Sequence, residues 1–335
     1  MGTYRQLPRS VHLDCSILDG AKMPVIGLGT YLMKDKEHQA VFDYALHIGY
    51  RLFDTAFSYG NSQLLGEVLQ DNIRSGKVKR RDLFITTKVP SVYLSPADVK
   101  DCVSESLEML KLQYVDLLLI HNPWGQKNLG RVGDGNIYPR DKNGDRILCE
   151  HDLNETWSAF ERLTEEKKVT SIGLSNLTPL LIDRILSKAH IIPANLQLEC
   201  NAYCQQYRLI KYCSERGISV TAYAPLAHTR QDTGKTDHGQ TDDPVLLKDE
   251  VILEMAKSYR KTPAQILLRF LLQQNICVVP KSSKLDRLHE NLDVFNFELD
   301  ASDVIAISKL NRNLKLFPFE WAKRHPDYPK DGEQF

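Results

Sequence analysis

Three side chains that could act as an acid, a base or a hydrogen-bond donor stand at the ends of successive apolar runs. Asp54, Lys88 and His121 recur 34 and 33 residues apart. That interval is the length of one strand-plus-helix unit, so in a parallel barrel the three strand ends would meet at one face. Tyr59 lies five residues beyond Asp54 and can join them. An acid, an amine, an imidazole and a phenol gathered there form a candidate catalytic group.

The phenol of Tyr59 is the group whose chemistry the others would adjust. A phenol has a pKa of about 10, which is high for proton donation at neutral pH. An ammonium favours the phenolate, so we expect Lys88 to lower the pKa of Tyr59, with Asp54 offsetting the cost of burying the ammonium. A neutral His121 could orient a carbonyl oxygen. The group would protonate an oxygen on which negative charge develops, an effect worth about 10²–10⁴ in rate.

Each of the four residues also has an ordinary structural interpretation. Lys88 could be a surface lysine at a strand end, and Asp54 could cap the next helix. His121 could be a hydrogen-bonded turn residue, and Tyr59 a loop aromatic. Their common register favours a shared role. A Schiff base on Lys88, as in an aldolase, is a less favoured reaction, and we expect no metal because the sequence has no HExxH motif or His/Cys cluster with ligand spacing.

Reduction of a carbonyl needs a hydride, which side chains do not supply, so a cofactor is expected. No GxGxxG motif opens a helix, and residues 27–32 lack its third glycine. A barrel can instead bind phosphate through the loops after its last strands. Lys281, Ser282 and Arg287 follow the eighth expected strand and suit a phosphomonoester, although a solvated basic turn has the same composition. Tyr223 follows the seventh and could stack on a flat heterocycle or pack in the core.

The elements that would position these residues alternate between strand and helix. Short apolar runs typical of buried parallel strands fall at residues 25–30, 50–55, 83–88, 115–121, 170–175, 194–199, 218–224 and 276–280. Helix starts are indicated by Ser95, by Thr178 and by a capping box from Thr262 to Gln265. Eight strands alternating with helices predict an α/β fold, a (β/α)8 TIM barrel; an open doubly wound sheet is the alternative.

Other segments lie outside this alternation. Residues 12–19 and 24–31 predict two short strands around a turn containing Gly20, an N-terminal β-hairpin whose second strand opens the barrel. Three segments are candidates to cover the carboxyl face, where binding loops belong: residues 122–152, 226–248 and 311–335. No linker or repeat divides the chain, so we expect a single domain over residues 1–335.

Composition excludes several classes of function. Of the 335 residues 42% are hydrophobic, and 43 basic residues balance 43 acidic ones, which leaves no global field for nucleic acid or an anionic membrane. The seven cysteines form no CxxC pair. No apolar run is long enough to span a bilayer, and the first residues contain no secretory signal. We therefore expect a cytoplasmic protein with reduced thiols, and a monomer because no coiled-coil heptads occur.

The chain resembles the aldo-keto reductases over about residues 10–330. The stretches that carry the likeness are IGLGTY at 26–31, FDTAFSY at 53–59, ITTK at 85–88, LLLIH at 117–121, SIGLSN at 171–176, PKS at 280–282 with Arg287, and Glu290-Asn291. The likeness is greatest to the branch of aldose/aldehyde reductases and hydroxysteroid dehydrogenases. It implies an NADP(H)-dependent reductase of a small-molecule aldehyde or ketone on a (β/α)8 barrel.

The resemblance also implies roles for individual residues. Tyr59 would be the general acid, Lys88 and Asp54 its tuning pair, and His121 the carbonyl-orienting group. The cofactor would meet Thr30, Tyr31, Asp54, Ser175, Asn176, Gln197, Tyr223, Leu226, Lys281, Ser282, Arg287, Glu290 and Asn291. Of these, Ser175, Asn176 and Gln197 would hold the nicotinamide carboxamide, Tyr223 would stack on its ring, Lys281, Ser282 and Arg287 would take the 2′-phosphate, and Glu290 and Asn291 would face adenine. The substrate would meet Tyr31, Ser58, Tyr59, His121 and Trp124.

Three positions depart from the family pattern. Phe57 stands where many members have His, Ser58 where an apolar residue is frequent, and Asn122 where a bulky aromatic is common, with Trp124 two residues further on. These positions would line or support the substrate pocket, so the carbonyl compound is left open. A cofactor-binding member of the fold without catalytic activity is the alternative, and the intact group of four residues counts against it.

Overall fold

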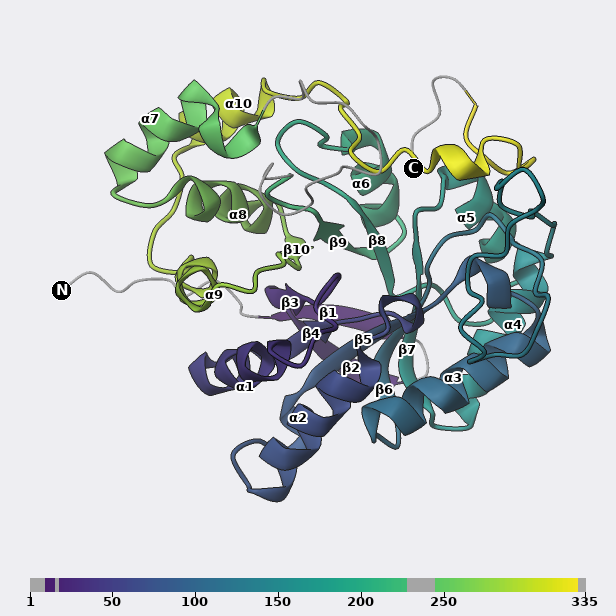
Figure 1. The fold of residues 1–335 in the computed structure, drawn as a ribbon. Coiled ribbons are helices and arrows are strands. Elements are labelled where there is room, and N and C mark those ends of the chain that lie inside the picture. Colours follow the sequence, from purple (N-terminus) through teal and green to yellow (C-terminus); the bar gives the residue numbers. More distant parts are fainter. Residues whose placement is uncertain (1–9, 16–17, 228–244, 331–335) are drawn as a thin grey trace.

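The strand order of the molecule is that of a closed barrel. The computed structural model describes residues 10–15, 18–227 and 245–330. Eight parallel strands lie side by side in sequence order (Figure 1). They are β3 (Gly27–Gly29), β4 (Leu52–Asp54), β5 (Phe84–Val89), β6 (Val115–Ile120), β7 (Val169–Ser175), β8 (Asn195–Glu199), β9 (Ser219–Tyr223) and β10 (Ile276–Val278). Ile26 bridges Val278, which joins the two edges. The (β/α)8 prediction is confirmed, and closure excludes the open doubly wound sheet.

Helices cover the outside of the barrel (Figure 1). They are α1 (His38–Ile48), α2 (Ser62–Arg74), α3 (Pro96–Leu110), α4 (Leu153–Glu165), α5 (Pro179–Leu186), α6 (Tyr207–Ser214), α7 (Glu250–Tyr259), α8 (Pro263–Gln273), α9 (Leu285–Leu292) and α10 (Ala301–Ser308). Short 3₁₀ turns are η1 (Phe57–Tyr59), η2 (Arg80–Asp82), η3 (Ser91–Tyr93), η4 (Leu246–Lys248) and η5 (Glu320–Ala322). Within the described residues, no helix is long and apolar enough to cross a membrane.

The predicted helix starts are confirmed by their caps. The side chains of Ser95 and Thr178 accept hydrogen bonds from backbone N–H groups in the first turns of α3 and α5. Thr262 and Gln265 form a complete capping box at α8. Each cap satisfies a donor that the helix itself leaves unpaired, which fixes where the helix begins.

The barrel strands are buried on both faces, which explains their nearly continuous apolar sequences. Residues of β6 from Leu117 to Ile120 are at most 1% exposed, and every residue of β5 is buried. Parallel strands enclosed by helices favour such sequences because neither face meets water. Lys88 is the charged residue in the buried strand β5. Because a buried ammonium is costly unless it is paired, Lys88 must have a partner of opposite charge.

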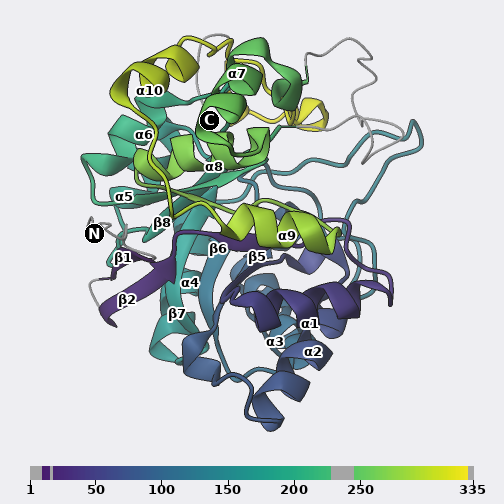
Figure 2. The same cartoon turned by 90° about the vertical axis from the view of Figure 1, so that its left-hand side faces the viewer.

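The N-terminal hairpin is confirmed, but its predicted placement is wrong. Strands β1 (Ser10–Cys15) and β2 (Leu18–Pro24) pair antiparallel, with Leu13 opposite Ala21. Gly20 therefore lies inside β2 and not in the turn. Residues 27–29 open the barrel as predicted, but they are not the second strand of the hairpin. Glycine is tolerated within strands, so by itself it was a weak turn signal. Figure 2 shows the hairpin at the end of the barrel opposite the 122–152 loop.

Candidate active site

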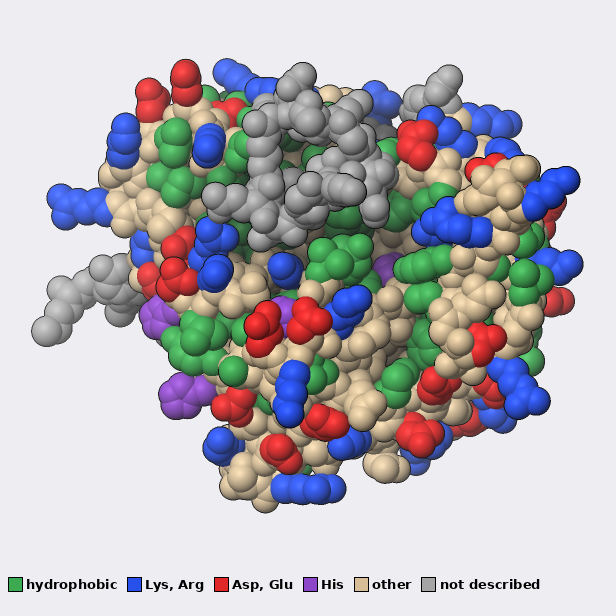
Figure 3. Space-filling model, viewed as in Figure 1, with side chains coloured by type: hydrophobic (Ala, Val, Ile, Leu, Met, Phe, Trp, Pro, Cys, Tyr) green, Lys and Arg blue, Asp and Glu red, His purple; other side chains and the backbone are tan. Residues whose placement is uncertain are grey.

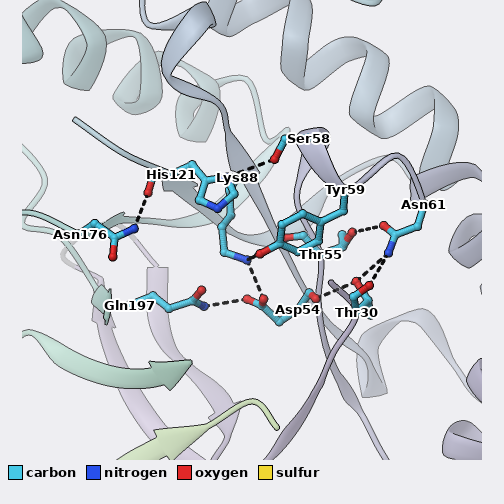
Figure 4. A network of polar contacts seen from close by, with 10 residues as sticks. All are labelled: Thr30, Asp54, Thr55, Ser58, Tyr59, Asn61, Lys88, His121, Asn176 and Gln197. Carbon is cyan, nitrogen blue, oxygen red and sulfur yellow. Dashed lines mark hydrogen bonds and ion pairs between the residues drawn. The ribbon is translucent and has the colours of Figure 1, made fainter. Parts of the chain in front are cut away.

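Lys88 is the centre of a buried polar network at the carboxyl end of the barrel (Figure 4). Its Nζ donates to Asp54 Oδ1 at 2.6 Å, to the Thr55 backbone oxygen at 2.9 Å and to the Tyr59 hydroxyl at 3.3 Å. Lys88 is 1% exposed and Asp54 is 4% exposed. The ion pair forms because β4 and β5 are neighbours, with Asp54 the last residue of β4 and Lys88 the last but one of β5. The predicted proximity of the two residues is confirmed.

His121 and Tyr59 face each other across the same site. The rings of Tyr59 and His121 meet edge to face with centroids 5.7 Å apart, and Tyr31 lies 5.1 Å from Tyr59 on another side. Ser58 Oγ is 3.4 Å from His121 Nδ1. Tyr31 is 45% exposed, so it lies where the site opens to solvent. The four predicted catalytic residues are thus together.

A second network, which the sequence interpretation missed, holds the loop that carries Tyr59. Asn61 Nδ2 donates to the backbone oxygen of Thr30 at 2.8 Å, and Asn61 Oδ1 accepts from Thr55 Oγ1 at 2.7 Å. Thr30 Oγ1 donates to the Asp54 backbone oxygen at 3.0 Å. These bonds tie both ends of the Tyr59 loop to β3 and β4. An asparagine just before a helix looks like an ordinary cap in sequence, so no signal distinguished Asn61.

Burial controls the charges in the site. Burial lowers the pKa of Lys88, and the Asp54 carboxylate opposes that shift. Burial raises the pKa of Tyr59 well above its usual value, and Asp54 raises it further. The net shift is therefore upward because desolvation of the phenolate is the largest effect, and the lowering expected from the Lys88 charge stays a prediction. Burial, with the Lys88 charge, lowers the pKa of His121 to about 3, so its imidazole is neutral at neutral pH.

Two of the amides expected to meet a cofactor bond to the catalytic neighbours. Gln197 Nε2 donates to Asp54 Oδ2 at 2.7 Å. Asn176 Nδ2 donates to the His121 backbone oxygen at 3.0 Å (Figure 4). It also donates to Asn122 Oδ1 at 2.9 Å. Asn176, which follows β7, and Gln197 of β8 therefore help to hold His121 and Asp54 in place.

The groups next to these amides fit a flat ring that carries an amide. The hydroxyl of Ser175 is buried and has no hydrogen-bond partner among the described residues, which is costly unless a ligand supplies one. The Tyr223 ring is partly exposed, and its hydroxyl donates to Asn176 Oδ1 at 2.8 Å. Leu226 lies beside it and is also partly exposed. A nicotinamide carboxamide would satisfy the Ser175 hydroxyl while its ring lies against Tyr223.

A cluster of cations lies between β10 and the first turn of α9. Within the described part of the chain, no acidic side chain forms an ion pair with Lys281, Lys284 or Arg287. Ser282 Oγ accepts from the Lys284 backbone N–H at 3.1 Å. Figure 3 shows Lys and Arg side chains over this part of the barrel face. Cations that no ion pair engages suit a phosphate. The sequence interpretation included Lys281 and Arg287 but not Lys284.

The expected adenine-facing residues are engaged within the protein. Glu290 Oε1 accepts from Thr262 Oγ1 at 2.6 Å, which links α9 to the start of α8. Asn291 is 3% exposed. Their contact with a cofactor stays a prediction.

A model of the Aldo/keto reductase family matches residues 25–312. The chain belongs to the aldo-keto reductase family. It is 36% identical to rat aldo-keto reductase family 1 member C15 over 326 residues, which cover 96% of this chain and 97% of that protein. It is 39% identical to human family 1 member A1 over 306 residues, 90% of each chain.

A solved structure agrees with the barrel. The aldose reductase from Schistosoma japonicum superposes with a TM-score of 0.86 at 37% identity, covering 94% of this chain and 98% of that one. Members of the family are oxidoreductases that act on carbonyl compounds, so this chain is an oxidoreductase. The predicted likeness to the aldose/aldehyde reductase branch is confirmed.

In this aldo-keto reductase Trp124 does not line an open pocket. The indole is fully buried against Phe319, Trp321 and Tyr328, and Nε1 donates to the Asp327 backbone oxygen at 3.1 Å. Contact of Trp124 with the substrate stays a prediction. Aromatic residues beyond residue 311 cover the indole, and their packing could not be read from the sequence.

A tyrosine of the 122–152 loop reaches the mouth of the barrel. Tyr138 is 44% exposed. It lies close enough to Tyr59 that a negative charge on its phenolate would raise the pKa of the Tyr59 phenol. The Arg146 guanidinium lies 4.2 Å from the Tyr138 ring centre and 4.5 Å from that of Trp321. Tyr138 could not be identified from the sequence, because a residue in a loop is not part of a helical or strand pattern of apolar residues.

Glu199 connects the barrel to the C-terminal segment, residues 311–330. Its carboxylate ends β8, is 3% exposed and accepts from the backbone N–H groups of Leu316 at 2.8 Å and Phe317 at 3.0 Å. Burial raises its pKa from 4.5 to about 7, against the effect of these hydrogen bonds. The Phe317 ring lies 5.6 Å from Tyr223. Of the two other segments expected over the carboxyl face, residues 228–244 lie outside the described residues.

Proposed function

We propose that this aldo-keto reductase reduces the carbonyl of a small aldehyde or ketone to an alcohol, with NADPH as the hydride source. The observation that carries the proposal is the lysine ammonium shared between a carboxylate at 2.6 Å and a phenol at 3.3 Å. The carbonyl oxygen would lie between Tyr59 and His121. NADPH supplies the hydride when it is bound; the remaining steps belong to the side chains.

The position of Tyr59, with its hydroxyl 3.3 Å from the Lys88 ammonium, supports the role of proton donor. Its phenol is protonated at neutral pH and would donate that proton as negative charge develops on the substrate oxygen, although burial makes the free phenol a weaker acid. The neighbouring Lys88 ammonium then stabilises the phenolate that remains. A neutral His121 donates a hydrogen bond to the same oxygen without competing for the proton.

The preference for NADPH over NADH is inferred from the cations beside β10. Lys281, Lys284 and Arg287 have no acidic partner among the described residues, and Ser282 adds a hydroxyl at the same turn. A 2′-phosphate would supply the missing negative charge through charge-assisted hydrogen bonds. The Schiff-base alternative is disfavoured because the Lys88 nitrogen is already held by three acceptors.

The test is the Tyr59→Phe variant. We expect NADPH consumption to be abolished with every member of a panel of aldehydes and ketones, because the proton donor is lost, while NADPH binds as before in calorimetry. Tyr44→Phe, a partly buried phenol on α1, serves as the control and should keep full activity. Turnover that survives in Tyr59→Phe would remove Tyr59 from this role, and an unmodified chain that binds NADPH but reduces no carbonyl would favour a non-catalytic member.

A further inference from the structure

Ser58 lies immediately before Tyr59 in η1 and turns its hydroxyl toward His121 (Figure 4). Its Oγ is 3.4 Å from Nδ1 of the imidazole, and this is the hydrogen bond that the ring makes with the described part of the protein. The other ring nitrogen, Nε2, has no protein partner among the described residues. Nδ1 of the ring therefore meets a hydroxyl, whereas Nε2 can hydrogen-bond to a ligand.

A neutral imidazole carries its proton on either Nδ1 or Nε2. His121 is neutral over the ordinary pH range, since burial lowers its pKa to about 3. To hold a carbonyl oxygen the proton must be on Nε2, because a bare Nε2 lone pair would repel that oxygen. Nδ1 must then accept a hydrogen bond, and a buried acceptor left unpaired is unfavourable.

Among the described residues, no neighbouring side chain donates a hydrogen bond to Nδ1 in place of Ser58. Asn176 donates to the backbone oxygen of His121 and not to its ring. The Lys88 nitrogen is committed to Asp54, Thr55 and Tyr59. The Ser58 hydroxyl makes no other hydrogen bond among the described residues and is free to rotate its proton toward Nδ1. An apolar side chain at this position could not do so.

We propose that Ser58 is a positioning residue: its hydroxyl donates to Nδ1 of His121, which places the imidazole proton on Nε2 and aims it at the substrate oxygen. The proposal rests on the proposed carbonyl reduction and refines it. It also replaces the expectation that Ser58 contacts the substrate, because the hydroxyl is used inside the protein.

The first test measures the tautomer directly and needs no turnover. The full chain is labelled with ¹⁵N-histidine, and the His121 signals are assigned by their loss in His121→Asn. We expect the wild-type ring to be protonated on Nε2. Ser58→Ala should increase the fraction protonated on Nδ1 at least several-fold, and Ser58→Thr, which keeps the hydroxyl, should restore the wild-type tautomer. A wild-type ring protonated on Nδ1, or one unchanged in Ser58→Ala, would overturn the proposal.

The second test asks whether the tautomer matters for the reaction. We expect Ser58→Ala to lower kcat/KM for a carbonyl about ten-fold while the NADPH Kd stays within two-fold, and Ser58→Thr to recover most of the loss. Equal activity of Ser58→Ala and wild type would count against a positioning role. If the wild-type chain reduces no carbonyl, the proposed function fails, and the labelling experiment still decides what Ser58 does to His121.

Discussion

At the scale of single residues, burial rather than residue type decides the chemistry of the site. Lys88, Tyr59 and His121 are ordinary titratable groups whose pKa values shift because they are removed from water. The sequence correctly indicated which groups meet, since strand register fixes their positions. It did not give the sign of the Tyr59 shift, because that depends on how deeply the phenol is covered and on how far Asp54 neutralises the lysine.

The His121 shift predicts a flat pH response. With its pKa lowered to about 3, the imidazole is neutral from about pH 5 to pH 9. We therefore expect log kcat against pH to show no break near 6.5, where a solvent-exposed histidine titrates. The measurement is the pH profile of kcat at saturating carbonyl and NADPH. A break near 6.5 that disappears in His121→Gln would show that the ring titrates in the working site.

The cation cluster predicts cofactor selectivity. Arg287→Ala should weaken NADPH binding by about 1.5–3 kcal/mol, roughly ten- to a hundred-fold, because a charged hydrogen bond to the 2′-phosphate is lost. NADH binding should change little. Arg208→Ala, on exposed α6, is the matched control. Calorimetric titration with both cofactors makes the comparison, and equal losses for NADPH and NADH would reject the assignment.

At the scale of elements, the C-terminal segment is attached to the rest of the molecule at several separate points. Glu199 binds the backbone at Leu316 and Phe317, and Trp124 and His325 link the segment to the 122–152 loop. His325 is 4% exposed. These contacts join parts far apart in sequence, so the sequence could suggest that the segment covers the barrel mouth but not which residues hold it there.

The Glu199 carboxyl predicts how stability depends on pH. Its pKa is about 7 in the folded chain and 4.5 when unshifted, so between these values the folded state binds more protons than the unfolded state. Stability from this group is therefore lost as pH rises from about 4.5 to 7, on the order of 3 kcal/mol in all.

Glu199→Gln should remove that dependence while keeping an acceptor oxygen for the backbone of the C-terminal segment. Urea unfolding of wild type and variant at several pH values between 5 and 8 gives the difference in their free energies of unfolding. The contributions of the other titrating groups cancel in this difference. We expect the variant to gain stability relative to wild type as pH rises. A difference that does not change with pH would show that Glu199 does not titrate in this range.

At the scale of the whole molecule, barrel closure depends on a close backbone approach that the sequence did not reveal. Gly29 N donates to the Pro280 oxygen at 3.0 Å, which joins the first and last strands. A Cβ on Gly29 would lie 2.6 Å from the Val279 backbone oxygen. The eight strands were predictable because each is a separate apolar run buried on both faces. Closure was inferred only from their number, and monomeric, cytoplasmic action stays a prediction.

Gly29→Ala should destabilise the barrel by about 1–3 kcal/mol, since backbone atoms must shift to admit the methyl group. Gly76→Ala is the comparison: its methyl would meet no atom within 4 Å, so it carries only the strain of a left-handed residue at φ +74°. Urea unfolding measures both. If Gly29→Ala is no less stable than wild type, the backbone where β3 meets β10 can shift to admit a methyl group without loss of stability.

The aromatic cluster around Trp124 gives the molecule an optical reporter. Of its three tryptophans, Trp124 and Trp321 lie together where the 122–152 loop meets the C-terminal segment, and Trp157 lies apart in α4, hydrogen-bonded to Ile191. Displacement of that segment would expose the first two indoles to water and leave the third in place. The wavelength of intrinsic fluorescence should therefore reveal, without any label, whether the segment moves when NADPH or a carbonyl compound binds.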